Sequence, residues 1–332
     1  MSHVAILGAG AWGTALARVL AEHGESPQLW TWQAEHAEAM QSARENREFL
    51  PGFALDSAIE PSADLGRVLH GANAVLLVVP TAGFRATLEQ ARPLVPTDAT
   101  LIIATKGIEP GSLMLLSEVV EAVLGEASRE RVVVLSGPSF AKEVALGLPT
   151  SVVAASVSEP RALSVQQRFS SDRFRVYAGD DPIGVQVGGA LKNVIAIAAG
   201  ACDGLGFGYN TRAALITRGL AEVARLALAK GGHALTLSGL AGLGDLVLTC
   251  TGELSRNRTV GYELGRGKGL AEALGELGHV AEGVITAESA YHLAARLGVD
   301  LPISSEVYRV LFEDKPVSEA VRAVLSRPLK RE

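Results

Sequence analysis

The sequence predicts an α/β protein in which an N-terminal doubly wound parallel sheet is followed by an all-helical C-terminal domain. Up to about residue 180, short runs of aliphatic and β-branched residues alternate with stretches of helical periodicity, a pattern typical of a parallel sheet covered by helices on both faces. Beyond residue 181 such runs largely stop, and helical patterns interrupted by glycines take over. We therefore expect one domain at residues 1–180 and a second at residues 181–332, joined within the turn-rich segment "AGDDP" at Ala178–Pro182.

The predicted elements follow one another in a regular order. The run "HVAILGAG" (His3–Gly10) predicts a buried strand that enters a glycine turn, and the next stretch predicts a helix closed by Gly24. Further strands of the same sheet are expected at 28–32, 74–80, 100–107, 131–139, 150–156 and 173–179. Helices of the second domain are expected at 183–202, 212–230, 256–264, 283–297 and 304–312.

Composition excludes several classes of protein. A chain of 332 residues with 48% apolar and 20% charged residues is not of the disordered class and can bury a core in each of about two domains. Its net charge of −6 argues against a broadly basic nucleic-acid binder. Cys202 and Cys250 lack the spacing of a disulfide framework or a zinc site, so we expect no metal. No apolar run approaches the ~18 residues of a membrane span, and the chain opens without a basic leader, so we expect a soluble protein of the cytoplasm.

The segment "GAGAWG" places Gly8, Gly10 and Gly13 in the spacing of a dinucleotide-binding turn. In such a turn the first glycine permits the tight bend, the second lets a pyrophosphate approach the backbone, and the third packs the helix against the strand. Because the segment follows a strand and opens a helix, we favour a Rossmann-type site for NAD or NADP over a plain tight turn.

The end of the second strand does not decide between NAD and NADP. Residues 28–34, "QLWTWQA", offer neither the acidic residue that binds the adenosine ribose nor an arginine for a 2′-phosphate. Glu35 and His36, which follow, have the pattern of the start of a solvated helix. Trp32 is a candidate for stacking on adenine, with core or interface packing as the alternative.

Small or polar residues end three of the predicted strand segments, at Pro80, Lys106 and Gly137–Ser139. Because ligands bind beyond the carboxyl ends of the strands in an open parallel sheet, we expect these residues along one edge of a site. For Lys106 on its own, a solvated loop is the alternative.

The stretch "VGGALKNVIAIAAGA" (Val187–Ala201) surrounds Lys192 and Asn193 with apolar and small residues on nearly every side of a helix. This is not the pattern of a surface helix with one wet face. A buried ammonium requires a partner, a depressed pKa, or both, which suits a general acid or base. The alternative is a lysine whose long stem carries the amine out to solvent.

The segment "GLAGLGDLVLTCTGELSRNRTVG" predicts an anion site. Ser255 is suited to cap the helix that follows, and Arg256 and Arg258 in its first turn oppose the helix dipole unless an anion binds there. An ordinary basic surface turn is the alternative. Asp245, in the glycine-rich loop, is a candidate partner for Lys192.

The chain carries, in order, the motifs "GAGAWGTALA", "ATKGIE", "SGPSFAKEVALGLPT", "GGALKNVIAIAAGACDGLGFGYNTRAALITRG", "GLAGLGDLVLTCT", "SRNR" and "VAEG". This ordered set resembles that of the bacterial-type NAD(P)-dependent glycerol-3-phosphate dehydrogenases, from about residue 4 to residue 313. The resemblance implies reversible reduction of dihydroxyacetone phosphate to sn-glycerol 3-phosphate, a precursor of phospholipids. It also implies a homodimer formed through the helical domain.

The resemblance further implies roles for individual residues. Lys192 matches the proton donor and acceptor, and Asn193, Asp245 and Thr249 are candidates for holding Lys192 and the substrate hydroxyls. The substrate-binding positions are matched by Lys106, Gly137, Ser139, Lys192, Asp245, Ser255, Arg256 and Asn257. The cofactor contacts are matched by Ala11, Trp12, Lys106, Ala141, Arg256, Val280 and Glu282. Ala11 stands where the family often has a serine, which removes one possible hydroxyl contact.

Two other functions are open at this stage. One is another two-domain dehydrogenase, acting on a 3-hydroxyacid or a sugar phosphate. The other is a non-catalytic redox sensor that binds a dinucleotide, although such a protein has no need of a lysine in an apolar helix.

Overall fold

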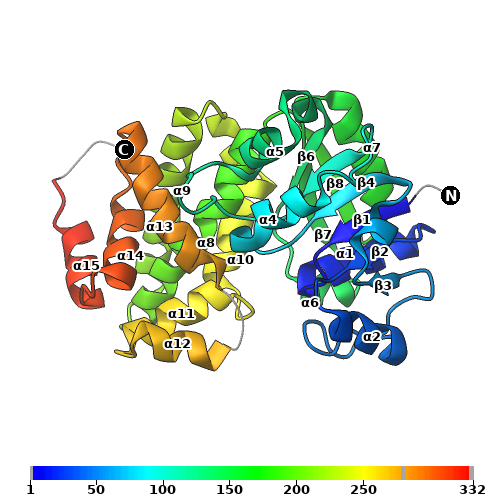
Figure 1. The fold of residues 1–332 in the computed structure, drawn as a ribbon. Helices are drawn as coiled ribbons and strands as arrows, with labels where there is room; N and C mark the ends of the chain where they lie inside the picture. Colours follow the sequence, from blue (N-terminus) through cyan, green and yellow to red (C-terminus); the bar gives the residue numbers. More distant parts are fainter. Residues whose placement is uncertain (1–2, 278–280, 329–332) are drawn as a thin grey trace. The chain divides into compact units, whose positions relative to one another are not determined.

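The computed structural model describes residues 3–277 and 281–328 (Figure 1). The chain forms two compact units. The sheet unit runs up to Thr105 and resumes at Leu116–Pro182, and the helical unit contains Lys106–Leu115 and the chain from Ile183 onward. The segment Lys106–Leu115 therefore packs with the helical unit, which the expectation of one boundary near residue 180 does not include.

The sheet unit is built on eight strands in the order β3-β2-β1-β4-β5-β6-β7-β8. Their bounds are β1 His3–Leu7, β2 Gln28–Trp30, β3 Glu60–Ser62, β4 Ala72–Leu77, β5 Thr100–Ile103, β6 Val132–Ser136, β7 Thr150–Ala155 and β8 Phe174–Gly179. Neighbouring strands are parallel except for β6 and β7, which are antiparallel. The predicted doubly wound α/β architecture is confirmed, with this reversal as a correction to an all-parallel sheet.

Burial explains why the strands read as continuous apolar runs. In β1, the side chains of Val4–Leu7 are all fully buried, although successive side chains of a strand point to opposite faces. Both faces of the sheet are therefore covered. The sequence pattern does not predict strand β3, because its Pro61 has no backbone N–H to donate. Proline is tolerated there because β3 lies at the edge of the sheet and has only one neighbouring strand.

Along the chain, the helices of the sheet unit alternate with its strands (Figure 1). They are α1 Ala11–Glu22, α2 Ala34–Ala43, α3 Leu65–Leu69, α4 Thr81–Ala91, α5 Leu116–Leu124, α6 Ala141–Ala145 and α7 Glu159–Phe169. The apolar face of α1, including Leu16 and Leu20, packs into one core with Ile6 of β1 and Leu76 of β4. This packing fixes the start of α1 at the carboxyl end of β1.

The helical unit is organised around α8, Pro182–Gly204. Around it lie α9 Tyr209–Ala229, α10 Asp245–Thr251, α11 Arg256–Gly265, α12 Leu270–Leu277, α13 Glu282–Leu297, α14 Pro302–Phe312 and α15 Val317–Leu325. The five helices predicted in this part are present, and α10, α12 and α15 are additional. Helix α8 is long and apolar enough to cross a membrane, but its apolar window is wholly buried in the protein, as in the core helix of a globular domain.

Helices α8 and α11 approach each other through reciprocal glycines. A Cβ added at Gly200, Gly204, Gly261 or Gly265 would lie 1.9–2.4 Å from a backbone carbonyl oxygen of the facing helix. Only glycine permits so close a backbone approach. The crossing holds the N-terminal part of α11 against the helix that carries Lys192.

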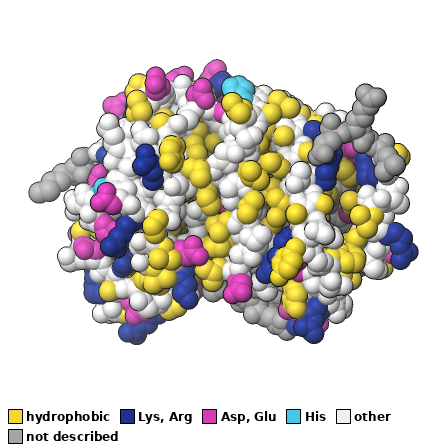
Figure 2. Space-filling model, turned by 180° about the vertical axis from the view of Figure 1, so that it is seen from behind, with side chains coloured by type: hydrophobic (Ala, Val, Ile, Leu, Met, Phe, Trp, Pro, Cys, Tyr) yellow, Lys and Arg dark blue, Asp and Glu magenta, His cyan; other side chains and the backbone are white. Residues whose placement is uncertain are grey.

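Figure 2 shows one face of the molecule with its side chains coloured by type. Among the described side chains on this face, Lys and Arg alternate with Asp and Glu, and hydrophobic side chains gather between them. This face therefore has no extended basic field of the kind that follows a nucleic-acid backbone.

Candidate active site

The glycine turn between β1 and α1 contains glycines of two kinds. Gly8 has φ +124°, and a Cβ there would lie 2.8 Å from the carbonyl carbon of Val78; a Cβ at Gly13 would lie 1.9 Å from the oxygen of Gly8. These two glycines are required by the fold itself. Gly10 has an ordinary φ of −75° and no heavy atom within 4 Å of an added Cβ, so the space beside it is open to a ligand.

The start of α1 fits a diphosphate. Gly10 is the N-cap residue and supplies no side-chain cap, so the first N–H groups of a twelve-residue helix lack a side-chain acceptor. The candidate contacts Ala11 and Trp12 form the first turn and are partly buried against the sheet core. The turn therefore offers backbone donors, a positive helix end and open space in one place.

Two interpretations of the β2 end require correction. Trp32 is 76% exposed, so it is not a core residue, and it remains available for stacking. His36 is buried and does not belong to a solvated face. Its Nδ1 lies 3.2 Å from the hydroxyl of Thr31, and its Nε2 lies 3.0 Å from Oδ1 of Asn46.

Asn46 connects the glycine turn after β1 to the end of β2. It is fully buried, and its side-chain amide donates to the carbonyl oxygen of Ala9 and to Thr14 Oγ1, both at 2.8 Å. Through His36, the same residue is connected to Thr31 at the end of β2. This network positions the glycine turn relative to the β2 end. Asn46 is not predictable from the sequence, because an asparagine in the polar segment "SARENREF" has no local signal of burial.

Three further candidates follow β6 in the sheet unit. Gly137 has φ +150° and lies so close to β7 that an added Cβ would be 2.8 Å from the Cα of Val152. The hydroxyl of Ser139 donates to the carbonyl oxygen of Gly137 at 2.9 Å. Ala141 opens α6 and is partly buried against the core. Lys106, expected on the same edge, is grouped with the helical unit.

In the helical unit, Lys192 lies at the centre of a buried polar cluster. Its Nζ donates to Asp245 Oδ1 at 2.5 Å and to Thr249 Oγ1 at 2.9 Å. Lys106 Nζ donates to the other oxygen, Asp245 Oδ2, at 2.6 Å. Asp245 is fully buried and Lys192 is 8% exposed, so the lysine stem does not carry its amine out to solvent.

Burial dominates the electrostatics of this cluster. It lowers the pKa of Lys192 to about 8, and the positive charge of Lys106 adds to this effect, whereas the Asp245 carboxylate opposes it. The two lysines share one carboxylate, with one amine on each of its oxygens. The amine of Lys192 can therefore exist in both protonation states near physiological pH.

Glycines bring Asp245 to the lysine. A Cβ at Gly188 of α8 would lie 2.6 Å from the oxygen of Ala241, and one at Gly242 would lie 2.1 Å from the oxygen of Leu237. The short π-helix Leu240–Gly244 is consequently packed against α8. Asp245 is the first residue of α10 rather than a loop residue, and the Thr249 hydroxyl donates to its backbone oxygen at 2.6 Å.

Asn193 has a different partner from the one expected. Its Oδ1 accepts from Asn257 Nδ2 at 2.9 Å, and Asn257 Oδ1 accepts from the N–H of Gly283 at 2.9 Å. The side chain of Asn193 therefore connects α8 to α11 and does not hold the Lys192 amine. Glu282, which opens α13, is half-buried, and the candidate Val280 lies outside the described residues.

The two arginines at the start of α11 have separate environments. Ser255 caps the helix, accepting from the N–H of Arg258 at 3.2 Å. The Arg258 side chain pairs with Asp203 at 2.8 Å, and Asp203 also accepts from Arg212. Arg256 is exposed and makes no hydrogen bond or ion pair within the described part of the chain, so its guanidinium is available to an anion. The sequence reasoning did not identify Asp203.

Among residues 3–277 and 281–328, no group of three or more His, Cys, Asp or Glu side chains is placed to hold a metal ion. Cys202 and Cys250 are both buried thiols, and burial raises their pKa values to about 11 and about 12. These thiols therefore stay protonated at neutral pH.

Comparison with known proteins decides the family. Residues 3–162 match the family described as NAD-dependent glycerol-3-phosphate dehydrogenase N-terminus, and residues 181–322 match the corresponding C-terminus. The chain belongs to the NAD-dependent glycerol-3-phosphate dehydrogenase family. The resemblance seen in the ordered motifs is confirmed.

Similarity to members of this family extends over the whole chain. Glycerol-3-phosphate dehydrogenase [NAD(P)+] of Geobacter sp. (strain M21) is 50% identical over 329 residues, which are 99% of this chain and 98% of the relative. The protein of the same name from Geobacter sulfurreducens is 52% identical over 329 residues, with the same coverage. The crystal structure of glycerol-3-phosphate dehydrogenase from Coxiella burnetii superposes with a TM-score of 0.94 at 43% identity, covering 98% of this chain and 99% of that one.

Proposed function

We propose that this protein interconverts dihydroxyacetone phosphate and sn-glycerol 3-phosphate with NAD(H) or NADP(H), and so supplies glycerol 3-phosphate for phospholipid synthesis. The observation that carries the proposal is the buried Lys192 amine, held by Asp245 and Thr249 beside a second lysine, Lys106. A dinucleotide-binding protein without catalysis has no use for an amine that is both desolvated and hydrogen-bonded.

The cofactor is proposed to bind at the glycine turn. The open space at Gly10 lets a diphosphate approach the backbone, the first N–H groups of α1 donate to it, and exposed Trp32 stacks on the adenine. The other proposed contacts are Gly8, Ala11, Trp12, Gly13, Lys106, Ala141, Arg256, Val280 and Glu282. When bound, the reduced nicotinamide supplies a hydride.

Lys192 is proposed to move the proton. As an ammonium it donates to the substrate oxygen during reduction of the ketone, and as a neutral amine it accepts the hydroxyl proton during oxidation. A pKa of about 8 keeps both forms populated near neutrality. Asp245 and Thr249 orient the amine, and the charge of Lys106 stabilises the negative charge that develops on the substrate oxygen.

The substrate phosphate is proposed to bind at the start of α11. Arg256 is exposed and available, Ser255 caps the helix beside it, and the dipole of a ten-residue helix favours an anion there. Asn257 helps to fix this end through its bonds to Asn193 and Gly283. Gly137 and Ser139 are proposed as further substrate contacts. Binding energy from the phosphate then orients the carbonyl group for reaction.

Family membership also supports a cytoplasmic enzyme that forms a homodimer through the helical unit. Large exposed hydrophobic side chains in that unit, including Tyr209 and Leu235, are compatible with a partner surface. Light scattering on the purified protein and fractionation of the cells that produce it test these two points.

The test of the activity is the loss of reduced-nicotinamide absorbance after dihydroxyacetone phosphate is added to the protein and cofactor. Turnover is expected with this substrate and not with dihydroxyacetone, which lacks the phosphate. Because reduction needs protonated Lys192, kcat/KM should fall about tenfold per pH unit above its pKa of about 8. Dinucleotide binding without turnover of any substrate would indicate a sensor.

A further inference from the structure

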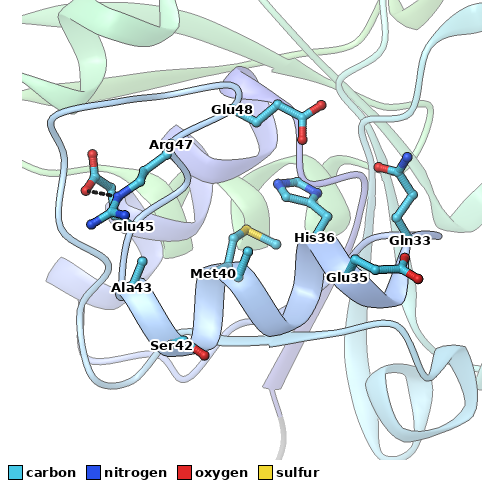
Figure 3. A pocket seen from close by; sticks show the side chains of 10 residues that line it. Gln33, Glu35, His36, Met40, Ser42, Ala43, Glu45, Arg47 and Glu48 are labelled. Atoms are coloured by element: carbon cyan, nitrogen blue, oxygen red, sulfur yellow. Dashed lines mark hydrogen bonds and ion pairs between the residues drawn. The ribbon is translucent and has the colours of Figure 1, made fainter.

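The sheet unit has a cavity of about 740 Å³ beside the end of β2 (Figure 3). It is lined by Gln33, which precedes α2, by residues of α2 that include Glu35 in its first turn, and by Glu45, Arg47 and Glu48. In a doubly wound sheet, the residues after the second strand lie beside the adenosine ribose of a bound dinucleotide. A 2′-phosphate on that ribose, the group that distinguishes NADP from NAD, would therefore meet the near end of this cavity.

Charge is distributed unevenly along the cavity. Arg47, the one Lys or Arg among the described lining residues, lies near Ala43 at the C-terminal end of α2, with Glu45 (Figure 3). Gln33, Glu35 and Glu48 lie at the other end of the helix. A ten-residue helix is about 15 Å long. Arg47 and the carboxylates of Glu35 and Glu48 therefore occupy different ends of the cavity.

Arg47 pairs with Glu45 at this end of the cavity. The guanidinium lies 3.2 Å from the Glu45 carboxylate, which also accepts from the N–H of Gly52 at 2.7 Å. The bond from Gly52 lowers the pKa of Glu45, so this carboxylate stays ionised and keeps its attraction for Arg47. Arg44, the neighbouring arginine, donates to the backbone oxygens of Leu55 and Ile59 and is not among the lining residues.

Without the nearby carboxylates of Glu35 and Glu48, the start of α2 would attract a phosphate. The dipole of a helix favours anions at the N-terminus. Glu35 already supplies a negative charge in the first turn, and Glu48 adds a second one at the same end of the cavity. The dipole is worth less than a full charge, so it does not offset two carboxylates facing a dianionic phosphate.

We infer that this chain selects NAD(H) over NADP(H), with Glu35 and Glu48 as the residues that disfavour a 2′-phosphate. Gln33, whose side chain is neutral and makes no cap bond to α2, can hydrogen-bond the neutral 2′-hydroxyl of NAD. The inference deepens the proposed function, because it assumes that the dinucleotide binds at the glycine turn of the sheet unit.

The primary test measures binding without turnover. Titration of the full chain with NADH and with NADPH, followed by the fluorescence of the reduced nicotinamide, is expected to give a Kd at least about tenfold higher for NADPH. In the double variant Glu35→Gln/Glu48→Gln, the ratio of the two Kd values should fall about three- to tenfold, mainly through tighter binding of NADPH. Gln33→Arg should lower it further, because arginine forms bidentate bonds with phosphate.

Glu38→Gln is the matched control. Glu38 lies on the exposed side of the same helix, outside the cavity lining, and the substitution removes the same charge. It should leave the ratio unchanged. Equal Kd values for the two cofactors in the unmodified chain, or an equal effect of Glu38→Gln and Glu35→Gln, would overturn the inference.

Turnover measured in parallel separates this inference from the proposed function. If NADH binds more tightly than NADPH but neither supports reduction of dihydroxyacetone phosphate, the proposed function fails and the selection stands. If both cofactors support reduction with equal kcat/KM and equal Kd, the selection fails and the proposed function stands.

Discussion

The glycine turn of the sheet unit and the α8–α11 crossing of the helical unit both depend on glycine, but they use its missing side chain in different ways. At Gly10 the space beside the backbone is empty to 4 Å. At Gly200, Gly204, Gly261 and Gly265 that space is filled by the backbone of the facing helix. The first arrangement leaves room for a ligand, and the second builds the scaffold on which reactive side chains are held.

Cofactor binding and proton transfer are therefore determined in different parts of the chain. The sheet unit offers backbone donors, whose positions depend on Gly8, Gly13 and the Asn46 network. The helical unit offers charged side chains, whose positions depend on helices that touch through glycine. Substitutions should therefore separate cofactor binding from proton transfer, and both from folding.

The largest effect is expected from Lys192→Met, which keeps the volume of the side chain and removes the amine. Turnover should fall by about 10²–10⁴, the usual contribution of general acid–base catalysis. The Kd for NADH should stay unchanged, because Lys192 is not among the proposed cofactor contacts. Stopped-flow kinetics and fluorescence titration of the same preparation measure the two quantities. Near-normal turnover would remove Lys192 from the mechanism.

The next largest effect distinguishes the two arginines of α11. Arg256→Ala should raise KM for dihydroxyacetone phosphate by about 10- to 100-fold, the worth of a hydrogen bond to a charged group, and leave the melting temperature nearly unchanged. Arg258→Ala should instead destabilise the protein, because it leaves the largely buried Asp203 with one cationic partner, Arg212. Steady-state kinetics and thermal melts on both variants form the comparison. An increase in KM that is equal in the two variants would argue against Arg256 as the phosphate contact.

Gly261→Ala tests the helix crossing. The added Cβ would lie 1.9 Å from the carbonyl oxygen of Ile197, so α11 must shift, at a cost of about 1–3 kcal/mol in the free energy of unfolding. Gly275→Ala is the matched control: it lies within α12 with no heavy atom within 4 Å of the added Cβ, and it should stabilise by about 0.5–1 kcal/mol. Denaturant unfolding of both variants gives the values. Equal stability would show that the crossing relaxes without cost.

Local sequence patterns were sufficient for the elements whose signal is local. Buried strands have apolar sequences, and α8 has the sequence of an apolar helix that contains Lys192. An element that is buried on all sides has an apolar sequence whichever segments pack against it, so its burial can be predicted locally. The environments of Arg258 and His36 were not predictable in this way. Their partners, Asp203 and Asn46, are ordinary polar residues that only the fold brings near.

Local sequence patterns also do not predict the direction of a strand or the unit into which a connecting segment packs. An antiparallel β7 has the same composition as a parallel one, and its direction is set by how the short α6 connection returns the chain. The segment Lys106–Leu115 joins the helical unit because Ile108 and Leu115 enter its apolar core beside α8. Nothing in ten residues after a strand indicates which of two units will bury them.

The smallest effect on stability, and the sharpest test of the comparison, is expected from Gly10→Ala. The residue has φ −75°, which alanine adopts without strain, and the added Cβ meets no heavy atom. The free energy of unfolding should therefore change by less than about 0.5 kcal/mol, since a poorer N-cap is offset by lower entropy of the unfolded chain. The Kd for NADH should nevertheless rise by about tenfold, because the methyl group occupies the space into which the diphosphate comes. Calorimetry and fluorescence titration measure the two effects. Unchanged binding would mean that the cofactor does not use the space at Gly10. The two glycine sites would then not differ in whether they bind a ligand.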